Sequence, residues 1–137
     1  MRFAIPLAVA TALAFPLGAL AETADSAART VIGAQIEAFL DGDHDRAFSF
    51  AAPSVKRYFR SSDAFVGMVK AGYKPVYAPR DYTFGRFAER GDDAFQEVMV
   101  TGPKGREWIA LYSLRKQGDG SYLITSCRLA PSNAQPI

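Results

Sequence analysis

The sequence predicts an α+β domain in which three N-terminal helices pack on a four-stranded antiparallel sheet. Apolar residues recur at helical spacing in the first part of the domain, for example at Ile32, Ile36 and Leu40. From Tyr73 onward this spacing gives way to four runs rich in Tyr, Phe, Val, Ile and Thr. Short turns that contain glycine separate the runs, so neighbouring strands must be antiparallel.

Capping and helix-breaking residues set the helix boundaries. A glycine after an apolar stripe stops a helix in the left-handed conformation, and Ser or Asp accepts hydrogen bonds at a helix start. Proline ends a helix because its ring cannot continue the backbone hydrogen bonds. By these signals the helices end at Gly42, Pro53 and Gly72, the second and third begin at Asp43 and Ser62, and residues 54–59 form a further helical turn.

The predicted sheet follows an extended connector. Pro75 and Pro79 indicate that residues 73–81 form no regular element. The strands are expected at 82–88, 94–101, 107–116 and 121–129. The tail at 131–137 is mostly small and polar, and we expect it to be disordered.

Composition limits the class of protein. The chain has 137 residues with 49% hydrophobic and 22% charged residues, which predicts one globular domain, placed here at 22–130. The single cysteine excludes a disulfide framework and a cysteine-based zinc site. The net charge of only +2 argues against a nucleic-acid partner.

Residues 1–21 have the features of a secretory signal peptide. Arg2 is followed by an uncharged stretch at 3–20, and Ala19-Leu20-Ala21 forms an A-x-A cleavage site. The alternative is a membrane anchor, but two prolines and a glycine interrupt the apolar stretch. We therefore expect a periplasmic or secreted protein with no stable membrane insertion after cleavage.

Three segments resemble a known family. They are AGYKPVYAPRDYTFG at 71–85, TGPKGREWIALYSL at 101–114 and DGSYLITSCRL at 119–129. They are similar to a family of small exported bacterial proteins known as domain of unknown function 4864. The order of helices and strands also resembles the nuclear transport factor two-like (SnoaL-like) superfamily, which implies a cone-shaped fold with a curved sheet. That superfamily includes isomerases, dehydratases, binding modules and assembly domains, so the resemblance implies no single activity.

Few residues are candidates for catalysis. His44 is the only histidine; it could act as a general base beside a carboxylate, but its place at a helix start favours a solvated turn residue. Cys127 has apolar or small neighbours and is expected to be a buried, unreactive thiol. No catalytic triad, phosphate-binding glycine loop or metal-ligand set is recognisable, so we expect no cofactor, no metal and no catalytic residue.

The connector carries the leading candidate binding site. Tyr73 and Tyr77 lie close to Arg80, and rings beside a guanidinium group can bind planar or anionic ligands. The alternative is that the rings close the mouth of the cone and pack the connector against the helices. We therefore expect a non-catalytic ligand-binding or interaction module, with a pocket between helices and sheet for a small anionic or aromatic ligand. The alternative is a small SnoaL-like enzyme of proton-transfer or hydration type.

The last hairpin predicts which side chains face the cavity. A three-residue loop at Gly118-Asp119-Gly120 pairs Gln117 with Ser121, whereas a two-residue loop would exchange the faces. With the first register Trp108, Tyr112 and Arg128 lie beneath the helices, and Arg128 becomes the anchor for an anionic ligand. Its alternative role is an ion pair with a helix carboxylate. The opposite face then carries Ile109, Leu111, Leu123, Cys127 and Leu129.

The third strand also predicts self-association. Residues 107–116 are apolar on both faces, and helices can cover only one face of a single sheet. A homodimer is the commonest way to cover the other face. The alternative is a strongly curled sheet that partly closes over itself.

Overall fold

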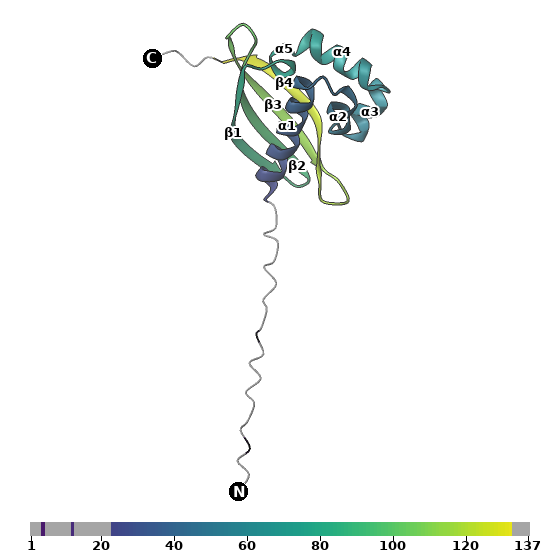
Figure 1. Ribbon diagram of the computed structural model, residues 1–137, viewed down its shortest axis with the longest axis vertical. Helices are drawn as coiled ribbons and strands as arrows, with labels where there is room; N and C mark the ends of the chain where they lie inside the picture. The colour runs from purple at the N-terminus through teal and green to yellow at the C-terminus, as the bar shows by residue number, and fades with distance from the viewer. Residues whose placement is uncertain (1–3, 5–11, 13–22, 133–137) are drawn as a thin grey trace, which may run out of the picture.

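The computed structural model describes Ala4, Ala12 and residues 23–132. Helices come first and strands follow, which confirms the α+β class (Figure 1). The helices are α1 (Ala24–Leu40), α2 (His44–Ser49), α3 (Pro53–Phe59), α4 (Ser62–Gly72) and α5 (Lys74–Tyr77). The strands are β1 (Asp81–Arg90), β2 (Asp93–Thr101), β3 (Glu107–Lys116) and β4 (Tyr122–Pro131). The predicted signal peptide lies outside the described residues, apart from the two alanines.

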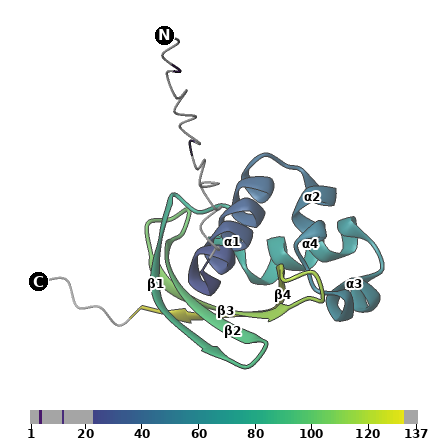
Figure 2. The same ribbon diagram turned by 90° about the horizontal axis from the view of Figure 1, so that it is seen from below.

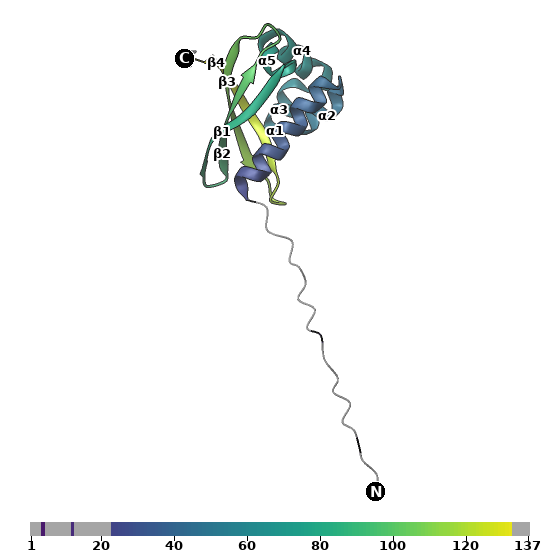
Figure 3. The ribbon, with the colours of Figure 1, turned by 60° about the vertical axis from the view of Figure 1, so that its left-hand side comes forward.

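The four strands form one antiparallel sheet in the order β1-β2-β3-β4. The sheet bends around α1, and all described helices lie on its concave side (Figures 2 and 3). The core lies between these two layers. Its largest fully buried side chains are Ile32, Ile36, Val66, Gln96, Val98, Val100, Tyr112 and Leu114.

The predicted helices differ from the observed ones at two places. The helical turn predicted at 54–59 is confirmed as part of a separate helix, but Pro53 begins this helix and does not end the second one. Proline is well tolerated in a first turn, where its missing N–H has no partner to lose. The connector at 73–81, predicted to be extended, contains the four-residue helix α5. Pro75 again occupies its first turn.

Two irregularities interrupt the ladders. In β1 the register shifts between Phe84 and Phe87, and the buried Gln96 on β2 supports the shift. Its side-chain Nε2 donates to the carbonyls of Gly85 and Arg86 at 3.2 Å each. The second irregularity lies opposite Ser113 and Leu114 of β3 and involves β4. Such bulges bend a strand and increase its twist.

The hairpin between β3 and β4 has the predicted register. The N–H of Gln117 donates to the carbonyl of Ser121 at 2.7 Å, and Gly120 has a φ of 87°. Tyr122 and Ile124 are accordingly buried on the concave face. The prediction is therefore correct for the first part of β4.

Beyond Ile124 the predicted faces are wrong. Leu114 pairs with Ile124, but Ser113 pairs with Ser126, so Thr125 is an extra residue in β4. One extra residue reverses the alternation of side chains, and Cys127 therefore lies opposite the inward-facing Tyr112. Arg128 is on the convex face and exposed, away from the helices. Cys127 and Leu129, expected on the convex face, are on the concave one.

The predicted disordered tail begins too early. Pro131 belongs to β4 and pairs with Trp108. The N–H of Ser132 donates to the carbonyl of Glu107 at 3.1 Å, so the ladder holds the chain in place up to this residue. The rest of the predicted tail, residues 133–137, lies outside the described residues.

Candidate functional site

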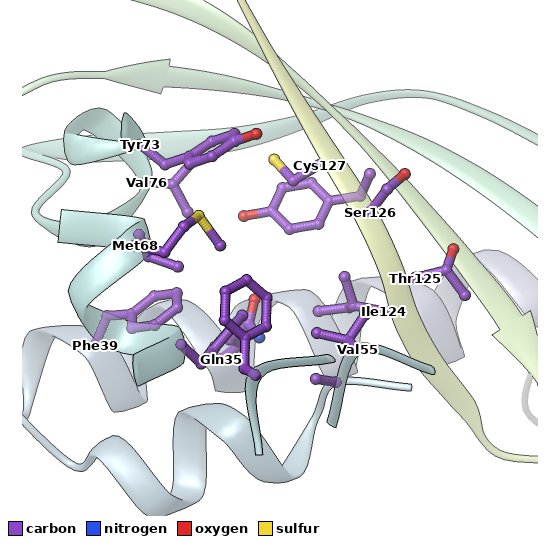
Figure 4. Close-up of a pocket in the computed structure, with 15 residues that line it drawn as sticks. Gln35, Phe39, Val55, Met68, Tyr73, Val76, Ile124, Thr125, Ser126 and Cys127 are labelled. Carbon is purple, nitrogen blue, oxygen red and sulfur yellow. The ribbon is translucent and has the colours of Figure 1, made fainter. Parts of the chain in front are cut away.

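A cavity of about 190 Å³ lies between β4 and the helices α3 and α4 (Figure 4). Most of its wall comes from α3 and α4, from Tyr73 and Val76 after α4, and from the middle of β4. The lining residues are Gln35, Phe39, Ala51, Val55, Phe59, Phe65, Met68, Val69, Tyr73, Val76, Tyr112, Ile124, Thr125, Ser126 and Cys127.

Aromatic rings from three helices form one wall of the cavity. Phe65 of α4 lies 6.2 Å from the ring of Phe39 in α1 and 5.6 Å from that of Phe59 in α3, measured between centroids. These separations are typical of attractive ring pairs. Figure 4 shows Met68 and Tyr73 on the helix side of the cavity and Cys127 on the strand side.

The cavity contains few polar groups, and no Lys, Arg, Asp, Glu or His among the described residues lines it. The Gln35 side chain is buried and donates its Nε2 to the carbonyl of Ala47 at 3.1 Å, which ties α1 to α2. Thr125 and Ser126 add hydroxyl groups from the bulge of β4. The cavity is therefore mostly apolar, with a few polar groups at fixed positions, and this lining suits a small apolar group better than a charged one.

Tyr112 has the most unusual environment. Only 1% of its surface is exposed, and its hydroxyl oxygen has no hydrogen-bond partner among the described residues. Burial raises the pKa of Tyr112 well above its ordinary value, and the neighbouring Cys127 thiol raises it further. A buried hydroxyl without a partner costs about 1–3 kcal/mol. The hydroxyl therefore has only the weakly polar Cys127 thiol beside it and makes no hydrogen bond of normal geometry among the described residues.

The Cys127 thiol is protonated at neutral pH. Burial raises its pKa from an ordinary value of 9.0 to about 12, and the Tyr112 side chain lowers it only in part. A thiol nucleophile needs the opposite shift, usually caused by a nearby cation or imidazole. The geometry thus agrees with the unreactive thiol expected from the sequence.

The remaining candidates for acid–base chemistry lie outside the cavity. His44 Nδ1 lies 3.0 Å from an oxygen of Asp63, so this pair links α2 to α4. Glu97 is paired with Arg86 at 3.2 Å, and Glu107 is exposed at the start of β3. None of these groups lines the cavity.

Of the six predicted site residues, Tyr73 and Tyr112 line the cavity. Tyr77 instead packs against the ring of Phe39, with 5.8 Å between the ring centroids, and Lys70 Nζ lies 5.4 Å from the centre of the Tyr77 ring. Its role is therefore packing, which was the alternative considered for the connector rings.

Trp108, Arg80 and Arg128 do not line the cavity. Trp108 is half-buried, and the Arg106 guanidinium lies 4.6 Å from the centre of its ring. Arg80 is exposed, and its backbone N–H donates a hydrogen bond to the carbonyl of Thr101 at 2.8 Å. Arg128 lies on the convex face for the reason given above. The proposed anionic anchor is therefore absent from the cavity.

Sequence reasoning missed the helical side of the cavity. Phe65, Met68 and Val69 share one face of α4 at helical spacing, which predicts a core face. That spacing does not reveal that the face leaves space against β4. No pattern in the sequence distinguishes a filled core from a core with a cavity.

Within residues 23–132 no three His, Cys, Asp or Glu side chains cluster closely enough to hold a metal ion. No helix among these described residues is long and apolar enough to cross a membrane.

Comparison with known proteins finds one family. The family described as "Domain of unknown function (DUF4864)" matches residues 21–137. No curated protein matches the sequence.

Three solved structures are similar in fold, each with 14% sequence identity. A DUF4783 family protein from Bacteroides ovatus has a TM-score of 0.49 over 73% of this chain and 94% of its own. An NTF-2 like protein of unknown function from Burkholderia xenovorans has a TM-score of 0.48 over 82% and 89%. An NTF2-like protein of unknown function from Burkholderia pseudomallei has a TM-score of 0.41 over 80% and 93%.

The burial of Cys127 predicts a pH dependence of stability. In the unfolded chain the thiol ionises near its ordinary pKa of 9.0, whereas in the folded protein it stays protonated up to about 12. Above pH 9 the folded state therefore binds more protons, and the free energy of unfolding falls by up to about 1.4 kcal/mol per pH unit from this group. Urea unfolding between pH 8 and 10.5 measures the effect.

The control for this prediction is Cys127→Ala. Its free energy of unfolding should fall less steeply above pH 9 than that of the wild type, because the thiol no longer contributes. Parallel curves for the two proteins would contradict the burial of the thiol.

Proposed function

The chain belongs to the family described as "Domain of unknown function (DUF4864)", and we propose that it is a non-catalytic module whose cavity binds a small, uncharged apolar group. The observation that carries this proposal is the buried Tyr112 hydroxyl without a partner in an apolar wall. A ligand that places one polar atom on this hydroxyl would remove the cost of leaving it unpaired.

The lining determines the chemistry of the ligand. Three phenylalanines, Met68 and several aliphatic side chains favour an aromatic or branched apolar group. An anionic group would lose its hydration without gaining a cation, since Arg80 and Arg128 lie elsewhere. We therefore keep the aromatic ligand expected from the sequence and no longer propose an anionic one.

Two matched probes test this proposal. Toluene and benzyl alcohol share a ring, but only benzyl alcohol carries a hydroxyl that could meet Tyr112. We expect both to bind with dissociation constants on the order of millimolar and to shift the NMR signals of Met68 and Tyr73. The Tyr112→Phe variant should lower the preference for benzyl alcohol about three- to tenfold, the contribution of one hydrogen bond.

A pair of variants on α3 controls for the location of binding. Val55 lines the cavity, whereas Ser54 is exposed on the same helix. Val55→Trp should reduce the binding of both probes at least tenfold, and Ser54→Trp should leave it unchanged. Equal binding by the two variants, or no binding to the wild type, would contradict the proposal.

We also propose that the convex face mediates a homodimer. Phe95, Met99, Ile109, Leu111 and Leu123 lie on this face, and all described helices are on the other side of the sheet (Figure 3). Leu111 is one of the few large apolar side chains that are exposed. A second copy would cover these side chains by a two-fold contact.

Light scattering at micromolar concentration tests the dimer. We expect the mass of two chains for the wild type and of one chain for Leu111→Glu, because burying a carboxylate against an apolar face is costly. Tyr58→Glu is the matched control, since Tyr58 is 80% exposed on α3 and lies outside this face. A monomeric wild type would rule the dimer out.

The N-terminal sequence indicates where the module acts. We propose that the module acts in the periplasm or outside the cell, after cleavage behind Ala21. The support is the A-x-A site and the uncharged stretch before it in the sequence.

A further inference from the structure

β4 is an edge strand of the sheet, and only part of its free edge is covered. The N–H of Ile124 donates to the carbonyl of Phe50 at 2.9 Å, and the N–H of Ala52 donates to the carbonyl of Ile124 at 2.8 Å. These two bonds form a short parallel bridge between Ala51 and Ile124. Pro53 then begins α3 and leads the chain away from the edge. One segment of this chain, residues 50–52, is therefore already hydrogen-bonded to this edge.

The ladder shows which backbone groups point to the remaining edge. In an antiparallel pair, residues that bond across the ladder alternate with residues whose N–H and C=O point outward. Ile124 points outward, because it bonds to the segment before α3. The β3 partner of Ile124 is Leu114, and Tyr112 and Ala110 lie two and four residues before it on the same strand. These two residues pair with Cys127 and Leu129, respectively. The N–H and C=O groups of Cys127 and Leu129 therefore also point to the free edge.

These outward groups have no partner from another element. Among the described residues, neither Cys127 nor Leu129 makes a backbone hydrogen bond outside the sheet. Unpaired groups of this kind are what an added strand bonds to in β-strand addition.

The cavity reaches this edge. Thr125, Ser126 and Cys127 follow one another in β4, yet all three line the cavity (Figure 4). Successive side chains of a regular strand point to opposite faces, so a cavity on one face alone would not contact all three. The bulge and the open edge together bring the cavity to the backbone of β4.

The volume of the cavity limits its occupant. Sites for whole small-molecule ligands usually measure about 300–1,000 Å³. The cavity here has about 190 Å³ and suits a single side chain better than a complete ligand. Its apolar wall favours an aromatic or branched side chain.

From this juxtaposition we propose that the cavity takes one apolar side chain of an extended segment of a partner protein, which adds as a strand to β4 at Cys127 and Leu129. The inference rests on the proposed function, since it names the source of the apolar group. The backbone bonds would supply affinity for any extended chain, and the cavity would select the side chain.

An NMR titration with the peptide acetyl-Thr-Thr-Phe-Thr-Thr-amide tests the inference. At saturation the amide signals of Cys127 and Leu129 should shift, and their hydrogen exchange should slow at least fivefold. The amide of Arg128, which bonds to β3, should change much less. Replacing the Phe of the peptide by Ala should weaken binding at least tenfold.

Two backbone-methylated peptides separate strand addition from simple insertion of a ring. One carries N-methyl groups on its odd-numbered residues and the other on its even-numbered residues, with all side chains kept. Because only alternate residues bond to an edge, one of the two should lose at least tenfold in affinity and the other should bind like the parent. Equal binding by both would overturn the inference.

The toluene and benzyl alcohol titrations distinguish the two possible failures. If these probes bind while the peptide leaves the amides of Cys127 and Leu129 unchanged, the cavity binds small molecules and the strand addition is wrong. If neither the probes nor the peptide binds, the proposed function itself is wrong.

Discussion

The extra residue at Thr125 in β4 is the constraint on which the candidate site depends. Before it, the hairpin places Tyr122 and Ile124 in the core. After it, the alternation is reversed, so that Cys127 faces Tyr112 and Arg128 faces away from the helices. Without the extra residue a guanidinium group would lie over the cavity and require a buried anion. With it, the wall stays apolar and the cavity reaches the edge of the strand.

This arrangement also determines the chemistry of the site. The cavity wall contains a thiol and a phenol whose pKa values are raised by burial, and no charged side chain from the described part of the chain lines it. Such a wall suits an apolar group, and burial keeps both its thiol and its phenol protonated at neutral pH. This lining supports the binding function proposed above, in which the Tyr112 hydroxyl supplies one polar contact.

Local signals in the sequence predict much of this fold. Glycines, prolines and capping residues locate most helix boundaries, and the Gly118-Asp119-Gly120 loop predicts the correct hairpin register. The bulge has no such signal, because Thr125 fits a regular strand as well as a bulge. The error at Arg128 and the two missed positions Cys127 and Leu129 all follow from that residue. The cavity itself depends on how α3 and α4 pack against β4, which no local spacing encodes.

The stability of the Tyr112→Phe variant without any added ligand tests the central claim most directly. If the hydroxyl has no partner stronger than the neighbouring Cys127 thiol, removing it deletes only a weak contact and removes a poorly satisfied polar group. The free energy of unfolding, measured in urea at neutral pH, should then equal or exceed that of the wild type, by up to about 2 kcal/mol. A loss of more than about 1 kcal/mol would contradict the account, because it would mean that the hydroxyl already has a partner within the protein.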